Sequence, residues 1–150
     1  MSSVAGSYPE LTCAFVGWLV SSLLKIPFSY FIHRKIDLKQ AFGTGGMPSS
    51  HSALMISTTL GIGLFDGFNH PTFALAIAIS TIVLYDAAGV RRQAGIHAER
   101  INMIIKELFE GKPLEEEDLK VMLGHSPLEV TGGVLVGVLC ALFVWLVWPK

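Results

Sequence analysis

The chain has 150 residues, of which 51% are hydrophobic and only 15% are charged, and its formal net charge is −1. Soluble domains average about 25% charged residues, nucleic-acid-binding proteins usually carry a basic excess, and disordered chains are poor in apolar residues, so the composition argues against all three classes. The length suits one domain over residues 1–150, and the mean hydropathy of +0.55 points to an integral membrane protein.

Four apolar runs predict about four transmembrane helices, at residues 11–32, 52–65, 71–84 and 130–148. A helix needs about 20 residues to cross the hydrocarbon core. The second run reaches that length only if residues 48–51 form its first turn, and the second and third runs together could instead form a re-entrant hairpin. The two cysteines, Cys13 and Cys140, lie inside apolar runs, as expected of small buried hydrophobic residues.

Two short interfacial helices are predicted between the third and fourth runs, at residues 96–110 and 114–123. In the first of them Ile101, Ile104 and Leu108 share one helix face, which indicates a helix lying on the membrane or on the bundle. In the second, acidic residues occupy the first turn, where the helix macrodipole favours them. The predicted fold is therefore an all-α, membrane-embedded helical bundle.

The order of these elements gathers the reactive side chains at one membrane face. The end of the first run, the start of the second, the end of the third and the start of the fourth all fall there, together with every Lys and Arg except Lys150. The positive-inside rule makes this face cytoplasmic in a multi-pass protein. Ionisable residues are costly at a membrane and usually mark a pathway or a site.

The start of the second run has the features of a phosphate-binding loop. Pro48 suits the first position of a helix, so the backbone N–H groups of Ser49, Ser50 and His51 would point at an anion. Gly46, just before them, lets the backbone approach closely. An ordinary capped helix start explains the same residues without any ligand.

The start of the fourth run offers a second histidine. His125 and Glu129 are four residues apart, so the carboxylate could orient the imidazole. Residues 126–129 also fit a capping box, with Ser126 as N-cap and Glu129 at N3. The two interpretations are compatible.

Three motifs, at residues 45–52, 85–92 and 123–130, resemble a small divergent membrane family related to acid phosphatases and vanadium-dependent haloperoxidases, within the type 2 phosphatidic acid phosphatase superfamily. Pro48-Ser49-Ser50-His51 resembles the superfamily signature Pro-Ser-Gly-His, with Ser50 in place of glycine. The resemblance implies that His51 is the general acid. It also implies that His125, followed by Glu129 as in His-x3-Asp, is the nucleophile.

The chain departs from the other superfamily signatures. Lys25 and Arg34 are nine residues apart rather than seven, and no proline follows Arg34. Arg91 stands six residues before His97, which makes His97 the alternative nucleophile, but Ile101 then occupies the position of the acidic partner.

The resemblance implies a phosphoric monoester hydrolase that acts on a membrane lipid with a phosphate headgroup through a phosphohistidine, without a metal or other cofactor. Paired guanidinium groups suit phosphate oxygens. The expected phosphate-binding residues are Lys25, Arg34, Gly46, Ser49, Ser50, Arg91 and Arg92. Asp86 either pairs with an arginine or serves as a second base.

Two other functions fit the same residues. Asp86, His51, His125 and Glu129 could chelate a divalent ion in a metal-dependent phosphohydrolase. Alternatively, the cations could bind anions or phospholipids without turnover. Gly133 and Gly137 form a Gly-x3-Gly pattern, which favours either a homodimer or close helix packing within one chain.

Overall fold

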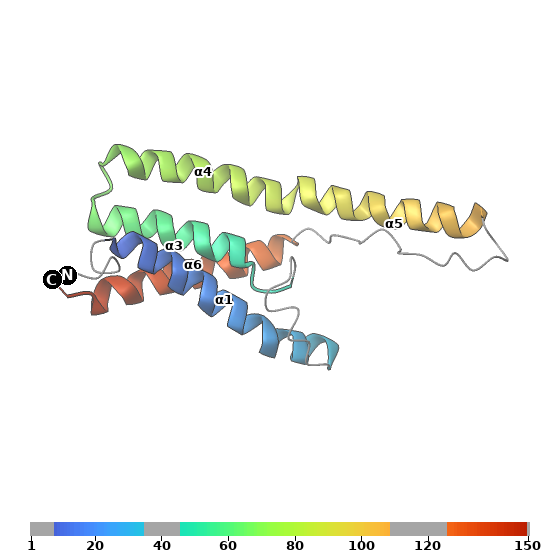
Figure 1. The fold of residues 1–150 in the computed structure, drawn as a ribbon, viewed down its shortest axis with the longest axis horizontal. Helices are drawn as coiled ribbons and strands as arrows, with labels where there is room; N and C mark the ends of the chain where they lie inside the picture. Colours follow the sequence, from blue (N-terminus) through green and yellow to red (C-terminus); the bar gives the residue numbers. More distant parts are fainter. Residues whose placement is uncertain (1–7, 35–45, 109–125, 150) are drawn as a thin grey trace.

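The computed structural model describes residues 8–34, 46–108 and 126–149, and helices dominate them (Figure 1). No strand occurs in these described ranges, so the predicted all-α class is confirmed. The described helices are α1 (Pro9–His33), α3 (Ser50–Phe65), α4 (Pro71–Ala88), α5 (Val90–Leu108) and α6 (Pro127–Val147).

Three stretches of described helix, Pro9–Phe31, Pro71–Ile105 and Pro127–Val147, are long and apolar enough to cross a membrane. The second predicted span, α3, has 16 residues, which corresponds to about 24 Å of helix against a hydrocarbon core of about 30 Å. It packs against α1, α4 and α6 and therefore lies at the centre of the bundle. All four predicted helices are present, and the shortest of them is the one that its neighbours shield.

Small residues allow the other helices to approach α3 closely. Gly17 of α1 lies against Ser57, and Gly133 of α6 lies against the carbonyl oxygen of Ser49. A Cβ atom on Gly137 would be 2.7 Å from the carbonyl oxygen of Ala53. Close approach through small residues is how membrane helices gain packing energy. Gly133 and Gly137 thus serve packing within one chain, and the homodimer stays a prediction.

Polar side chains join α3 to α4 near the middle of both helices. The hydroxyl oxygens of Thr59 and Ser80 are 2.7 Å apart, and both residues are buried. Ser80 Oγ also donates to the carbonyl oxygen of Met55 at 3.4 Å. Such interhelical hydrogen bonds satisfy polar groups where no water is available.

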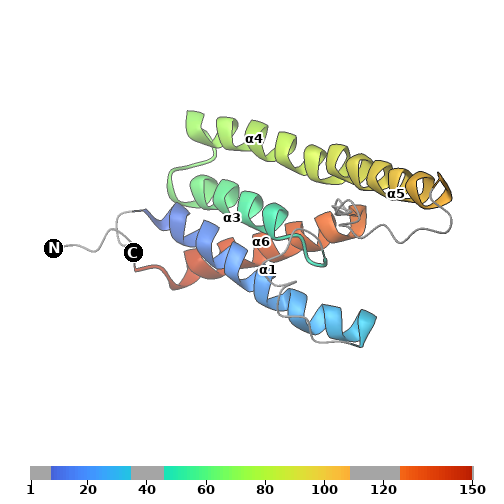
Figure 2. The same cartoon turned by 45° about the vertical axis from the view of Figure 1, so that its right-hand side comes forward.

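The helix ends meet as the topology predicts. The C-terminal end of α4 and the N-terminal ends of α3 and α6 lie at one end of the bundle, and α1 also ends on that side (Figure 1). The start of α1 and the end of α6 lie at the opposite end (Figure 1). A second view gives the same arrangement and shows the last turns of α1 diverging from α3 and α6 (Figure 2).

Helix α5 continues α4 in almost the same direction after a break at Gly89 (Figures 1 and 2). The hydrogen-bond ladder persists across the break, because Gln93 N–H donates to the Gly89 carbonyl oxygen at 3.0 Å. The helix therefore begins at Val90, six residues before the predicted start at Ile96. It contacts α4 and no other described helix, so it does not lie on the bundle. The second predicted interfacial helix, at 114–123, falls outside the described residues.

Candidate functional site

The N-terminal ends of α3 and α6 are tied together by hydrogen bonds. Ser49 is the N-cap of α3: its Oγ accepts from the Ser52 N–H at 3.3 Å, and its own N–H donates to the Glu129 carbonyl oxygen at 3.0 Å. Ser126 Oγ accepts from the Glu129 N–H at 3.3 Å, which confirms the predicted N-cap of α6. The start of α3, with its partial positive charge, is therefore held against the first turns of α6.

Helix α3 begins two residues later than predicted. Ser50, not Pro48, is its first residue, because Ser49 takes the N-cap position. The Ser49 N–H is bonded to Glu129, so it is not directed at a ligand as expected. Ser50 and His51 occupy N1 and N2, where a helix supplies no backbone acceptor for the N–H group. Gly46 has a φ of +79°, a left-handed conformation that explains the glycine.

Lys25 lies inside the bundle rather than at its surface. Only 2% of its surface is exposed, and the Glu129 carboxylate of α6 interacts with it electrostatically. Ser22 and Ser29, at 2% and 5% exposure, share its face of α1. Among the described helices α1 contacts only α3 and α6, so this polar face is directed at them. A buried lysine in a membrane helix is costly, which makes Lys25 a candidate functional residue.

The two serines beside Lys25 were missed by the sequence reasoning. Their signal was present, since Ser22, Lys25 and Ser29 recur at spacings of three and four within an otherwise apolar run. Ser49 and Ser50, which were predicted, are buried at 0% and 6% exposure. Glu129 links the three helices, because it interacts with Lys25 of α1 and accepts from Ser49 at the start of α3. The polar residues of these segments are called the polar cluster: Ser22, Lys25, Ser29, Ser49, Ser50, His51 and Glu129.

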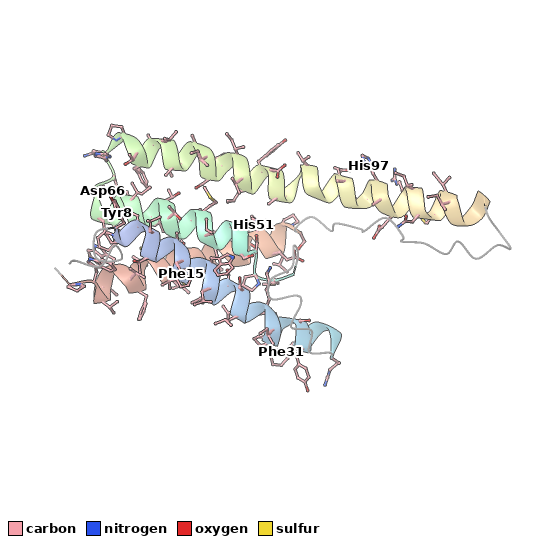
Figure 3. The ribbon with its side chains drawn as sticks, in the orientation of Figure 1. Tyr8, Phe15, Phe31, His51, Asp66 and His97 are labelled. Atoms are coloured by element: carbon pink, nitrogen blue, oxygen red, sulfur yellow. The ribbon has the colours of Figure 1, made fainter. Side chains whose placement is uncertain are left out.

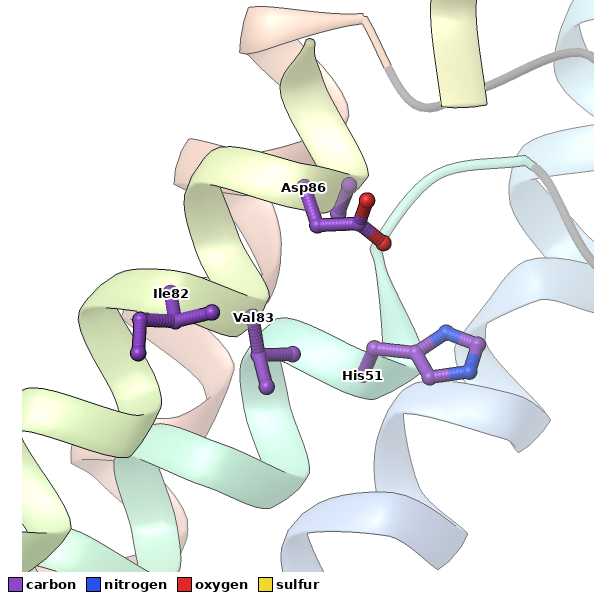
Figure 4. A pocket seen from close by; sticks show the side chains of 5 residues that line it. His51, Ile82, Val83 and Asp86 are labelled. Atoms are coloured by element: carbon purple, nitrogen blue, oxygen red, sulfur yellow. The ribbon is translucent and has the colours of Figure 1, made fainter. Parts of the chain in front are cut away.

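A pocket of about 170 Å³ adjoins this cluster between α3 and α4. His51 and Asp86 line it together with Ile82, Val83 and Ala87 (Figure 4). The His51 imidazole and the Asp86 carboxylate extend to the same side of the helix pair (Figure 4). The pocket thus joins two ionisable groups to an aliphatic wall, and it brings Asp86 of the second motif to His51 of the first.

Other predicted residues lie farther away or outside the described part of the chain. Arg34 is the exposed C-cap of α1, about 14 Å along the helix axis from Lys25. His97 is exposed on α5, well separated from His51 (Figure 3). Arg91 and Arg92 belong to the first turn of α5, but their side chains, like the whole of His125, fall outside the described residues.

The described residues contain no group of three or more His, Cys, Asp or Glu side chains placed to hold a metal ion. Of the four ligands considered for a divalent ion, His51 and Asp86 share the pocket, and Glu129 belongs to the first turn of α6. His125 lies outside the described ranges, so the structure leaves that ligand set incomplete.

Comparisons with known proteins agree with this architecture. A sequence model of the "Divergent PAP2 family" matches residues 7–140. A Bacillus subtilis (strain 168) protein described as "Uncharacterized membrane protein YuiD" is 35% identical over 135 residues, covering 83% of this chain and 85% of that protein. No solved structure matches the chain significantly.

Proposed function

Because the chain belongs to the divergent PAP2 family, we propose that it is a phosphoric monoester hydrolase whose substrate is a membrane lipid bearing a phosphate headgroup. One observation carries the proposal. A buried lysine, a histidine and two helix N-termini converge at one end of a membrane bundle. This combination favours a phosphate held at the edge of the hydrocarbon core.

The phosphate is bound between α1 and the start of α3. The Lys25 ammonium supplies the positive charge, and the backbone N–H groups of Ser50 and His51 donate to phosphate oxygens. The Ser49 hydroxyl oxygen accepts from the Ser52 hydroxyl, and Ser49 is fully buried, so its role is to shape the loop. Arg91 and Arg92, just beyond the end of α4, clamp the remaining oxygens in paired fashion.

The chemistry proceeds in two balanced steps. A ring nitrogen of His125 attacks phosphorus while the bond to the lipid alcohol breaks, and protonated His51 gives its proton to the leaving oxygen. A water molecule then attacks the phosphohistidine: the P–N bond breaks, His51 accepts the proton from water, and phosphate leaves. Glu129 orients His125 and balances the charge of Lys25. Asp86 lines the same pocket as His51, and its carboxylate is the negative charge that acts on the His51 imidazole.

The test is phosphate release by the pure protein in detergent micelles from phosphatidate, phosphatidylglycerol phosphate and isoprenyl phosphate. We expect His51→Ala to lower the rate about 10²- to 10⁴-fold, and His125→Ala to abolish turnover while vanadate still binds. His70→Ala is the matched control, because His70 caps α4 at the opposite end of the bundle. The proposal fails if the unmodified protein releases phosphate from none of these lipids.

The same assay separates the other two functions. Full activity in the presence of a chelator would oppose a metal-dependent hydrolase, and vanadate binding without any turnover would indicate an anion-binding protein. The active face is proposed to be cytoplasmic, because the cations gather there. Impermeant thiol labelling of Ser126→Cys from each side of the membrane tests that orientation.

A further inference from the structure

The pocket beside His51 is unsuited to a phosphate group. One of its two ionisable side chains is the Asp86 carboxylate, and the rest of its lining is aliphatic: Ile82, Val83 and Ala87. A carboxylate repels a phosphate dianion, and an aliphatic wall cannot replace the anion's hydration. The groups proposed to bind the anion belong to α1 and to the starts of α3 and α6, and apart from His51 none of them lines this pocket. The pocket therefore suits the organic part of a phosphate ester.

The proposed reaction places that organic part on the pocket side. The attacking and leaving groups of a phosphoryl transfer lie roughly in line on opposite sides of phosphorus. In the proposed reaction the nucleophile is His125, which precedes α6 in the sequence, and His51 protonates the leaving oxygen. The leaving alcohol then lies next to His51, which lines the pocket that α4 completes.

The lining of the pocket continues onto the outer surface of the bundle. Ile82 is 69% exposed and Tyr85 is 77% exposed on α4. Because α4 belongs to the stretch Pro71–Ile105, which is long and apolar enough to cross a membrane, we infer that these side chains face the bilayer. At about 170 Å³, the pocket is smaller than the roughly 300–1,000 Å³ that encloses a whole drug-sized ligand. It takes the first part of a chain whose remainder stays outside, in the lipid.

The hydrogen bonds between α3 and α4 set the lower limit of this opening. Thr59 and Ser80 join the two helices, and Ser80 precedes Asp86 by six residues, or about 9 Å of helix. Between that junction and the level of Asp86, α4 contributes Ile82 and Val83 to the lining of the pocket.

Resting on the proposed function, we propose that Ile82 and Val83 form a hydrocarbon-chain subsite, open sideways to the bilayer between α3 and α4, which selects esters of long-chain alcohols over soluble phosphomonoesters. A free phosphomonoester such as glycerol 3-phosphate offers the same phosphate but no chain for this wall. Val83 is the decisive residue, because it is half-buried in the pocket, whereas Ile82 lies at its outer edge.

The first experiment needs no turnover. Val83→Cys is labelled with a maleimide in detergent micelles, and Leu75→Cys, which is lipid-exposed on α4 outside the pocket, is the matched control. The unmodified protein, whose Cys13 and Cys140 are buried, gives the background. We expect dioleoyl phosphatidate to slow labelling of Val83→Cys several-fold more than labelling of Leu75→Cys, and glycerol 3-phosphate to protect neither. Equal protection of the two positions, or protection by glycerol 3-phosphate, overturns the subsite.

The second experiment compares kcat/KM for the same two esters. The unmodified protein should prefer dioleoyl phosphatidate. Val83→Trp should lower kcat/KM for dioleoyl phosphatidate about tenfold or more, because the indole fills the pocket. Leu75→Trp should leave it unchanged. Equal rates on both esters, or an unaltered preference in Val83→Trp, overturn the subsite. Chain-specific protection without release of phosphate from any ester would support the subsite and reject the phosphatase.

Discussion

The contact between α3 and α6 can be tested with two adjacent glycines that have different surroundings. A Cβ atom on Gly133 would meet the Ser49 carbonyl oxygen and lie 2.8 Å from the Cβ of Ser52, so backbone and a buried side chain would have to move. On Gly132 its nearest neighbour would be the Met47 methyl group at 3.2 Å, the far end of a flexible side chain. We expect Gly133→Ala to destabilise the fold and Gly132→Ala not to.

The size of the difference follows from two opposing effects. Alanine stabilises a helix interior by roughly 0.5–1 kcal/mol relative to glycine, and this gain is common to both variants. Overpacking a tight interface costs about 1–3 kcal/mol, and this cost applies to Gly133→Ala alone. The free energies of unfolding should therefore differ by about 2 kcal/mol, which corresponds to roughly 4–8 °C in Tm for a chain of this size.

Thermal unfolding of the purified proteins in mild detergent, followed by circular dichroism, measures this gap, and light scattering of the same samples gives their mass. Equal Tm values for the two variants would refute the packing described for α3 and α6. A change in mass without a gap in Tm would show instead that Gly133 serves a homodimer. Because the Ser49–Glu129 hydrogen bond lies at the same contact, phosphate release should fall further in Gly133→Ala than in Gly132→Ala.

Two further predictions concern polar groups inside the bundle. Lys25→Met should weaken vanadate binding about tenfold or more, and it should lower Tm because the Glu129 carboxylate loses its cation. Adding Glu129→Gln should restore Tm but not the affinity for vanadate. Recovery of both would mean that Lys25 has only a structural role. Thr59→Val should lower the free energy of unfolding by about 0.6 kcal/mol, because it removes the hydrogen bond to Ser80. Thr81→Val should be nearly neutral, because the Thr81 hydroxyl is exposed and bonded within its own helix. Equal effects of the two substitutions would contradict the α3–α4 junction.

The sequence was sufficient to predict the helices and the end at which the polar segments meet. Apolar runs locate α1, α3, α4 and α6 to within a few residues, because the bilayer demands continuous apolar helix. Helix starts were harder to predict: at α3 both Pro48 and Ser49 are favourable starting residues, and the serine takes the N-cap since its side chain accepts from Ser52. After the third apolar run the next helix was predicted to begin only at Ile96, yet the backbone hydrogen-bond ladder continues across Gly89 into α5.

Contacts between helices could not be read from the sequence. Asp86 was assigned to an arginine or to a second base, and only the packing of α4 on α3 brings it to the pocket of His51. Lys25 was predicted to bind phosphate, but its burial between α1, α3 and α6 depends on which face of α1 turns inward. Local spacing fixes which residues share a face, while the choice of partner helix depends on long-range packing.

The offset between α3 and α6 connects the fold to the kind of substrate proposed. Gly133 faces Ser49, and α6 begins six residues earlier, at Pro127, so α3 starts about 9 Å below the start of α6. At the other end the two helices finish level, where the rings of Phe65 and Trp148 meet at 5.9 Å. His51, in the first turn of α3, therefore also lies below the start of α6. A phosphate must reach this depth in the bundle to meet Lys25. A lipid headgroup reaches it more easily than a hydrated free ester, because the chain of the lipid already occupies the bilayer beside α4.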